Sequence, residues 1–227
     1  MKILIRIFVA AAIIASAGSR SVRAADGITS VPNEDNKIAL TFDDGPHPVY
    51  TEQILKILDE YGVKATFFVI GENAERYPEI IRHEIAAGHE IGNHTYTHPH
   101  MRNTDEKSLS LELRKTEKLL REGFGIKPVL FRPPEGFCCK TVKSCAGLMS
   151  YDIVLWDIDT TDWAHNSVDN IVKTVVSSAK TGDIILCHDY VTKPSPTPQA
   201  LEKFIPRLLA KGYKFVTVSD LISSDGV

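Results

Sequence analysis

The chain has 227 residues, of which 43% are hydrophobic and 24% charged, and its formal net charge is −3 at neutral pH. That length and composition are typical of a soluble globular protein with one well-buried core, so we expect a single catalytic domain. The charges are mixed along the chain and create no basic field, which argues against nucleic acid as a partner.

The N-terminal residues 1–24 have the pattern of a secretory signal peptide. Lys2 and Arg6 precede an apolar stretch over residues 7–17, and Val22 and Ala24 occupy the two positions that a signal peptidase reads. We predict cleavage after Ala24 and export, to the periplasm or out of the cell. The apolar stretch is too short to span a bilayer comfortably, so no stable membrane insertion is expected after cleavage; a retained anchor is the alternative.

Residues 25–36 are polar and are expected to form a linker or N-terminal arm before a catalytic domain over residues 37–227. In that domain, short apolar runs alternate with amphipathic segments, which is typical of α/β proteins. Repeated strand–helix units imply a parallel sheet or a barrel with its chemistry at the C-terminal strand ends. In chain order, we predict strands over residues 38–42, 65–70, 90–93, 129–131, 153–157, 184–187 and 214–217, and helices over residues 50–61, 78–87, 106–123, 168–179 and 198–211.

The reactive side chains gather at the C-terminal ends of these predicted strands. A random scatter of polar residues would populate both ends, so this placement favours one shared pocket. The residues are Asp43 and Asp44 after the first strand, His94 and His98 after the third, Arg132 after the fourth, Asp159 and Asp162 after the fifth, and His188 after the sixth.

Asp44, His94 and His98 are the candidate metal ligands. The two histidines are four positions apart and share one face if the segment is helical. One carboxylate and two imidazoles suit zinc and leave a position for a water, whose pKa the ion lowers to about 7. Adjacent side chains of extended backbone point to opposite sides, so Asp43 has a separate task. Taken singly, the acidic pair could be an ordinary turn and each histidine a solvated or core residue.

Four cysteines lie in the chain, and in an exported protein they could pair. Cys138, Cys139 and Cys145 are close enough in sequence for one local bridge, although the spacing does not fix the connectivity. Cys187 lies in a predicted strand, which favours a small buried hydrophobe over a redox role. Asn93 begins a glycosylation sequon, which we interpret as a coincidence because a glycan there would cover a proposed ligand.

Five motifs, in this order, resemble those of the polysaccharide deacetylases of the NodB-homology type, carbohydrate esterase family four. They are Thr41-Phe42-Asp43-Asp44-Gly45, His94-Thr95-Tyr96-Thr97-His98, Arg132-Pro133-Pro134-Glu135-Gly136, Asp159-Thr160-Thr161-Asp162-Trp163 and Leu186-Cys187-His188. The likeness covers roughly residues 37–221. It implies a distorted (β/α) barrel with seven or eight parallel strands, and a divalent metal that helps remove acetyl groups from N-acetylated sugars.

By position, the resemblance implies that Asp43 is the general base and that Arg132 orients it. It also implies that His188 is the general acid, that the carboxylate of Asp162 is the partner of His188, and that the three candidate ligands named above bind the metal. A guanidinium beside Asp43 keeps that carboxylate ionised, whereas an aspartate beside His188 favours imidazolium, so one group can accept a proton and the other can donate one. Asp159 is the alternative partner of His188.

The sequence departs from the family at Glu135, a position that is usually aromatic. Because Pro133 and Pro134 have no N–H, the backbone N–H of Glu135 could still donate to the oxyanion of a tetrahedral intermediate. The acidic side chain could repel anionic glycans, or it could bind the amine of the product. A surface pair is the alternative interpretation of Arg132 and Glu135.

Trp163 and Leu186 are expected to form a small apolar wall for the acetyl methyl group. Phe137 or Tyr190 could stack on a sugar, with core packing as the alternative for both. We expect Zn²⁺ as the cofactor, with Co²⁺, Ni²⁺ or Mn²⁺ as alternatives. The predicted substrate is an N-acetylglucosamine glycan of the peptidoglycan or chitin type. An O-acetyl esterase acting on acetylated xylan and a glycan-binding module without turnover are the competing hypotheses, and the oligomeric state is open.

Overall fold

The computed structural model describes residues 26–164, 166–191 and 194–223, so the predicted signal peptide lies outside the described residues. In the described ranges no helix is both long and apolar enough to cross a membrane. The strands are β1 (Lys37–Asp43), β2 (Thr66–Val69), β3 (Glu90–Asn93), β4 (Leu130–Phe131), β5 (Asp152–Ile153), β6 (Ile158–Asp159), β7 (Ile184–His188) and β8 (Lys214–Val216). The helices are α1 (Tyr50–Glu60), α2 (Gly71–Arg76), α3 (Pro78–Ala86), α4 (Glu106–Phe124), α5 (Lys140–Met149), α6 (Val168–Ser178), α7 (Thr197–Ala210) and α8 (Val218–Ser223), with 3₁₀ turns η1 (Met101–Asn103), η2 (Pro134–Gly136) and η3 (Asp162–Ala164).

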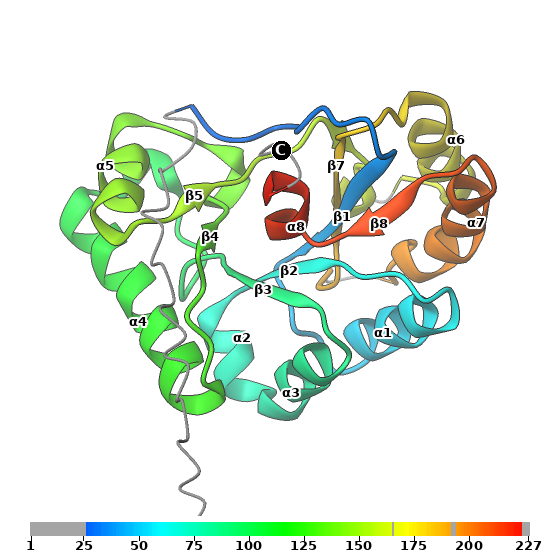
Figure 1. Cartoon of the computed structure of the whole chain (residues 1–227). Coiled ribbons are helices and arrows are strands. Elements are labelled where there is room, and N and C mark those ends of the chain that lie inside the picture. The colour runs from blue at the N-terminus through cyan, green and yellow to red at the C-terminus, as the bar shows by residue number, and fades with distance from the viewer. Residues whose placement is uncertain (1–25, 165, 192–193, 224–227) are drawn as a thin grey trace, which may run out of the picture.

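The strands pair in parallel and run in the order β5-β4-β3-β2-β1-β7-β6, with β8 added beside β1. The sheet curls, and α1 to α7 lie around its outside in Figure 1. This is the distorted (β/α) barrel that the resemblance implied. Because all the strands point the same way, their C-terminal ends meet at one rim, as that fold requires.

The central strand β1 sets the positions of the first reactive residues. Its residues are buried except for the first, as expected of a parallel strand covered on both faces. It pairs with β7 in a register that places Asp43 beside His188, and its other edge pairs with β8 at the start and with β2 at the end. Two residues 145 positions apart in the chain are therefore neighbours at the rim.

The opposite end of the barrel is closed by α8, which lies in the middle of the view in Figure 1. The backbone N–H of Val218 donates to Oγ1 of Thr66 (2.9 Å), and that of Ser219 donates to Oε2 of Glu90 (3.0 Å). Thr66 and Glu90 begin β2 and β3, so α8 covers the N-terminal strand ends. The side chains of Val218 and Leu221 are fully buried there. The rim with the reactive residues is consequently the end that can admit a substrate.

Residues 26–36 lie against the barrel between its two edges. Ile28 bridges Val154 and Ser30 bridges Asp183, while the N–H of Val31 donates to the carbonyl of Gly182 at 2.8 Å. Ile28 and Val31 are buried (7% and 6% exposed). This segment, the blue start of the coloured chain in Figure 1, thus fills the gap that the short strands β5 and β6 leave.

The prediction of one strand over residues 153–157 was wrong, because β5 ends at Ile153 and β6 begins only at Ile158. The N–H of Val154 still bonds the carbonyl of Phe131 on β4, whereas that of Asp157 bonds the carbonyl of Ile184 on β7. Residues 154–157 therefore cross from β5, at one edge of the curled sheet, to β6, at the other edge. A single paired strand cannot make this crossing. Helices α2, α5 and α8 were not predicted at all.

Candidate active site

A cavity of about 670 Å³ opens at the C-terminal ends of the strands. Arg132 and Asp162 are fully buried and bond directly to residues of its wall. The structure therefore brings all the predicted site residues into one place. Those that line the cavity are Asp43, Asp44, His94, His98, Glu135, Trp163, Leu186 and His188.

The turn after β1 directs both of its carboxylates into this cavity. Asp44 has a left-handed backbone with φ of 76°, which reverses the alternation that extended chain would give. The amide of Asn73 donates to the Asp44 carbonyl at 2.8 Å and holds this conformation. A Cβ at Gly45 would overlap the buried carboxylate of Asp189, so glycine is the residue that fits behind the acidic pair.

The helical spacing that we assumed for His94 and His98 was wrong, because they lie in an irregular loop after β3. Thr95 and His98 have positive φ angles of 69° and 56°. Oδ1 of Asn93 accepts from the N–H of Thr95 (2.9 Å), and Oγ1 of Thr95 accepts from that of His98 (3.1 Å). Asn93 is fully buried and its amide donates to the Leu113 carbonyl, so its sequon has no room for a glycan.

Asp44, His94 and His98 form the metal-ligand set, with ligand atoms that lie within 4.8 Å of one another. Oδ1 of Asp44 is 3.4 Å from Nε2 of His94 and 3.5 Å from Nε2 of His98. That oxygen is buried and has no hydrogen-bond partner in the described chain. Nδ1 of His94 lies 2.7 Å from the carbonyl of Arg132, an arrangement that leaves Nε2 as the free lone pair. These residues fit a divalent cation.

The electrostatics of Asp44 and His98 favour the protonation states that a cation needs. At His94, burial lowers the pKa, but the charge of Asp43 and the contact with Asp44 outweigh it and raise that pKa, so a cation would displace a proton there. Burial raises the pKa of Asp44, but the close contact and charge of His94 outweigh it, so the pKa lies below its ordinary value. Burial and then the neighbouring His94 lower the pKa of His98. An ionised carboxylate and a neutral imidazole are the ligand forms that bind metal.

Asp43 is held by a fully buried arginine, so the interpretation of Arg132 as part of a surface pair was wrong. Nη1 of Arg132 donates to Oδ1 of Asp43 at 2.7 Å and to Oγ1 of Thr41 at 2.8 Å. Its guanidinium carbon lies 4.2 Å from the ring centroid of Phe68, and its other nitrogens donate to two backbone carbonyls. The second oxygen of Asp43 faces the metal-ligand set, 3.8 Å from Nε2 of His94.

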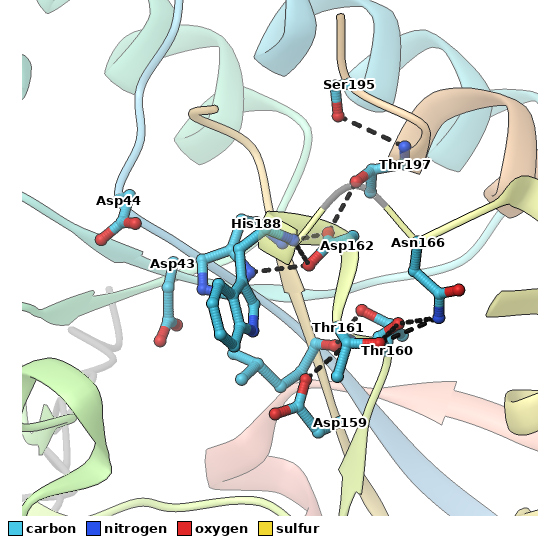
Figure 2. A network of polar contacts seen from close by, with 12 residues as sticks. Asp43, Asp44, Asp159, Thr160, Thr161, Asp162, Asn166, His188, Ser195 and Thr197 are labelled. Atoms are coloured by element: carbon cyan, nitrogen blue, oxygen red, sulfur yellow. Dashed lines mark hydrogen bonds and ion pairs between the residues drawn. The ribbon is translucent and has the colours of Figure 1, made fainter. Parts of the chain in front are cut away.

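His188 is held by Asp162, and the alternative that paired it with Asp159 was wrong. Figure 2 shows Oδ1 of Asp162 facing Nδ1 of His188, at 2.8 Å. Oδ2 of Asp162 accepts from the backbone N–H of His188 at 2.7 Å and from Oγ1 of Thr197 at 2.6 Å. Asp159 instead accepts from the N–H of Thr161.

This network sets the charge of His188. Burial lowers the pKa of the imidazole, but the hydrogen bond and charge of Asp162 outweigh that effect and raise the pKa to about 9. Burial likewise raises the pKa of Asp162, and His188 outweighs it in turn, which leaves that pKa below its ordinary value. The pair is therefore an imidazolium beside a carboxylate at neutral pH, a proton donor at the cavity wall.

Glu135 lies in η2 with a left-handed backbone (φ of 58°), and its carboxylate pairs with Nδ1 of His100 at 2.8 Å. Trp163 is 56% exposed, whereas Leu186 is buried.

The ring of Tyr190 packs on His47 rather than in the cavity. All four cysteines are free thiols, so the local bridge is absent.

Sequence reasoning missed two cavity residues, Arg102 and Trp156. Arg102 comes from η1, shortly after the second histidine, and no motif marked it. Trp156 comes from the crossing between β5 and β6, which was predicted as plain strand. A Cβ at Gly136 would come within 2.6 Å of the Trp156 ring, so this aromatic ring lies close against the loop that carries Glu135.

The fold and these residues define an α/β barrel of the carbohydrate-esterase type. A family model described as polysaccharide deacetylase matches residues 30–154. A peptidoglycan-N-acetylglucosamine deacetylase of Bacillus cereus is 43% identical over 194 residues, which are 85% of this chain and 91% of that protein. The chain belongs to the polysaccharide deacetylase family.

Solved structures agree with this assignment. A crystal structure of a peptidoglycan N-acetylglucosamine deacetylase in complex with 4-naphthalen-1-yl-N-oxidanyl-benzamide matches with a TM-score of 0.82 and 38% identity, covering 85% of this chain and 91% of that one. A family 4 acetyl xylan esterase from Clostridium thermocellum in complex with a cobalt ion matches with a TM-score of 0.76 and 36% identity, covering 84% and 92%.

Proposed function

We propose that the protein is an exported, metal-dependent hydrolase that removes N-acetyl groups from N-acetylglucosamine glycans of the peptidoglycan or chitin type. The observation that carries the proposal is one cavity in which Asp43, held by Arg132, and His188, held by Asp162, both flank the Asp44–His94–His98 set. The similarity to peptidoglycan deacetylases supports the substrate class.

The three ligands would hold Zn²⁺, with Co²⁺, Ni²⁺ or Mn²⁺ as alternatives, since similar nitrogen and oxygen donors bind all four. When bound, such a cation supplies Lewis acidity, which lowers the pKa of water and polarises a carbonyl oxygen. Within the chain, Asp43 accepts the proton of the attacking water through its oxygen that does not contact Arg132. His188 donates a proton to the leaving amine through Nε2, because its Nδ1 is engaged by Asp162.

Three further residues of the wall have proposed roles. The backbone N–H of Glu135 donates to the oxyanion, as neither Pro133 nor Pro134 has an N–H. Trp163 and Leu186 form the apolar wall for the acetyl methyl group, and both line the cavity. An exported location suits this substrate, because peptidoglycan and chitin lie outside the cytoplasm.

The proposal is tested by acetate release from N-acetylglucosamine oligomers after the protein has been stripped of metal and reloaded with Zn²⁺. Asp43→Asn should keep the bound metal and lose turnover by about 10²- to 10⁴-fold, the usual worth of a positioned base. His94→Ala should lose both metal and turnover. Asp169→Asn is the matched control, since this exposed aspartate pairs with Lys203 outside the cavity. Normal turnover by Asp43→Asn would show that the base is misassigned.

An O-acetyl esterase is the second candidate function, favoured by the similarity to an acetyl xylan esterase. The same groups could cleave the more labile ester bond. Acetate release from acetylated xylan, measured beside that from N-acetylglucosamine oligomers, separates the two activities. Failure to release acetate from either substrate would favour a glycan-binding module without turnover.

A further inference from the structure

The cavity has a cationic side chain that the proposed reaction does not use. Arg102 lies in η1, four positions after His98, and lines the same cavity as the metal-ligand set. Its neighbour Met101 is 2% exposed and anchors η1 in the core. The guanidinium carbon lies 4.7 Å from the ring centroid of Phe137, a stacking contact that leaves the guanidinium edge open.

The positive charge of Arg102 is also not balanced by an ion pair with any described residue. Within the described ranges it makes no ion pair and donates no hydrogen bond to the chain, and no other lysine or arginine lines the cavity. The carboxylates of the lining, by contrast, are all engaged. Asp43 pairs with Arg132, Asp44 with His94 and His98, Glu135 with His100, and Asp159 accepts a backbone N–H.

We propose that Arg102 binds a carboxylate on the sugar next to the one that is deacetylated. A stacked guanidinium with a free edge matches a carboxylate with two parallel hydrogen bonds. This inference rests on the proposed function and narrows its substrate class. Chitin carries no anionic group in its repeat, whereas the glycan strand of peptidoglycan carries a lactyl group on alternate sugars, and this group is a free carboxylate wherever no stem peptide is attached. Acidic glycans of that kind are therefore preferred over neutral ones.

The arrangement of the loops places this carboxylate away from the acetyl group. Trp163 and Leu186, the proposed wall for the acetyl methyl, come from the β6 and β7 side of the barrel. Arg102 and Phe137 come from the loops after β3 and β4. A sugar that reaches Arg102 is thus a neighbour in the glycan chain rather than the sugar that loses its acetyl group.

Glu135 does not cancel this preference. Its Oε1 lies 2.8 Å from Nδ1 of His100, and it makes no ion pair with Arg102. The departure from an aromatic residue at this position consequently leaves the Arg102 edge free. The view that Glu135 repels anionic glycans is the opposite expectation, and the same measurement decides between them.

The test uses two ligands that differ only in the charge of their lactyl groups. One is an oligomer of alternating N-acetylglucosamine and N-acetylmuramic acid with free lactyl carboxylates, and the other has those carboxylates converted to methylamides. Calorimetry on the metal-loaded protein should give about tenfold tighter binding of the acidic oligomer, decreasing as salt is added. In Arg102→Gln the ratio of the two dissociation constants should fall close to one. Arg102→Lys should retain part of the preference, because a lysine keeps the charge but loses the planar edge.

Arg82→Gln is the matched control. The Arg82 guanidinium also stacks on a phenylalanine, with its carbon 5.5 Å from the ring centroid of Phe124, but it pairs with Glu79 and lies outside the cavity. In this variant the preference for the acidic oligomer over the methylamide oligomer should equal that of the wild type. Equal binding of the two oligomers by the wild type, or an unchanged ratio in Arg102→Gln, would overturn the inference. Acetate release is measured separately, so a preference for the acidic oligomer without acetate release would refute the proposed activity alone.

Discussion

Two buried ion pairs give the cavity one proton acceptor and one proton donor. Asp43 bonds Arg132, whose guanidinium is enclosed by a phenylalanine ring, a threonine and backbone carbonyls. His188 bonds Asp162, which also accepts from Thr197. The environments differ in sign, because the Arg132 cation lies beside the general base Asp43 and the Asp162 anion lies beside the general acid His188. One side chain is thereby poised to accept a proton and the other to donate one.

The charge of Asp162 should set the basic limb of the pH profile. The pKa of His188 is raised to about 9, so the imidazolium is present at neutral pH and is lost as the pH rises through that value. Asp162→Asn keeps an acceptor for Nδ1 but removes the negative charge. We expect the basic limb of kcat/KM to move to lower pH by about 1 to 2 units, with a fall in kcat at neutral pH.

Thr197→Val is the comparison for this prediction, because it removes a hydrogen bond to Asp162 and leaves the carboxylate in place. Loss of the Thr197 hydroxyl weakens the stabilisation of the Asp162 charge but does not remove that charge. The basic limb should therefore move much less in Thr197→Val than in Asp162→Asn. pH–rate profiles with N-acetylglucosamine oligomers measure both shifts. If Asp162→Asn kept the wild-type limb, that limb would belong to another group.

Among the elements, β2 and β3 connect the packing of the barrel to the position of Arg132. Gly92 of β3 pairs with Phe68 of β2, and a Cβ at Gly92 would lie 2.5 Å from the Phe68 ring. That ring is fully buried and contacts the Arg132 guanidinium. Gly92→Ala should therefore lower the free energy of unfolding by about 1 to 3 kcal/mol, the usual cost of overpacking, and should also reduce kcat by displacing Arg132.

Gly123→Ala controls for the loss of a glycine. Gly123 lies in α4, and an added Cβ there would meet no heavy atom within 4 Å. This variant should gain about 0.5 to 1 kcal/mol, because alanine is the better helix former. Denaturant unfolding of both variants checks the pair. Equal stabilities would mean that the Phe68 ring has room to move.

Apart from α5, which has ten residues, the elements that sequence reasoning missed lack a long periodic pattern. Helices α2 and α8 have six residues each, which is less than two helical turns. The crossing that carries Trp156 consists of residues that would suit a strand, and its pairing depends on an arm more than a hundred positions earlier. Arg102 belongs to a 3₁₀ turn of three residues. These features depend on tertiary contacts, and a local pattern carries no signal for them.

At the scale of the whole molecule, the rim was predictable because parallel strands all place their C-terminal ends on one side. Asp43, His94, Arg132 and His188 each end or directly follow such a strand, so counting strands was enough to gather them. The geometry of the ligand loop was not predictable. The left-handed backbone of Thr95 and His98, rather than a helix, brings the two imidazoles together.

His89, which lies outside the active site, should contribute a loss of stability to the fold in mild acid. Its imidazole is 8% exposed, and its Nδ1 accepts the backbone N–H of Ala65 at 3.2 Å. Burial, and then the charge of Lys64, lower the pKa of His89 to about 4. Above pH 6.5 this histidine is neutral in both states. As the pH falls from about 6.5 to about 4, the unfolded chain takes up a proton that the native protein does not, so stability is lost.

The expected loss is about 2 kcal/mol across this window, after allowance for partial screening by solvent. His89→Gln removes the titrating group while its amide oxygen can still accept the Ala65 N–H. Between pH 6.5 and pH 4, the unfolding free energy of this variant should therefore rise relative to that of the wild type. His83→Gln is the control, since His83 is 59% exposed and pairs with Glu52 at the surface. Parallel curves for His89→Gln and the wild type between pH 4 and 6.5 would mean that His89 gains its proton in the native state as readily as in the unfolded chain.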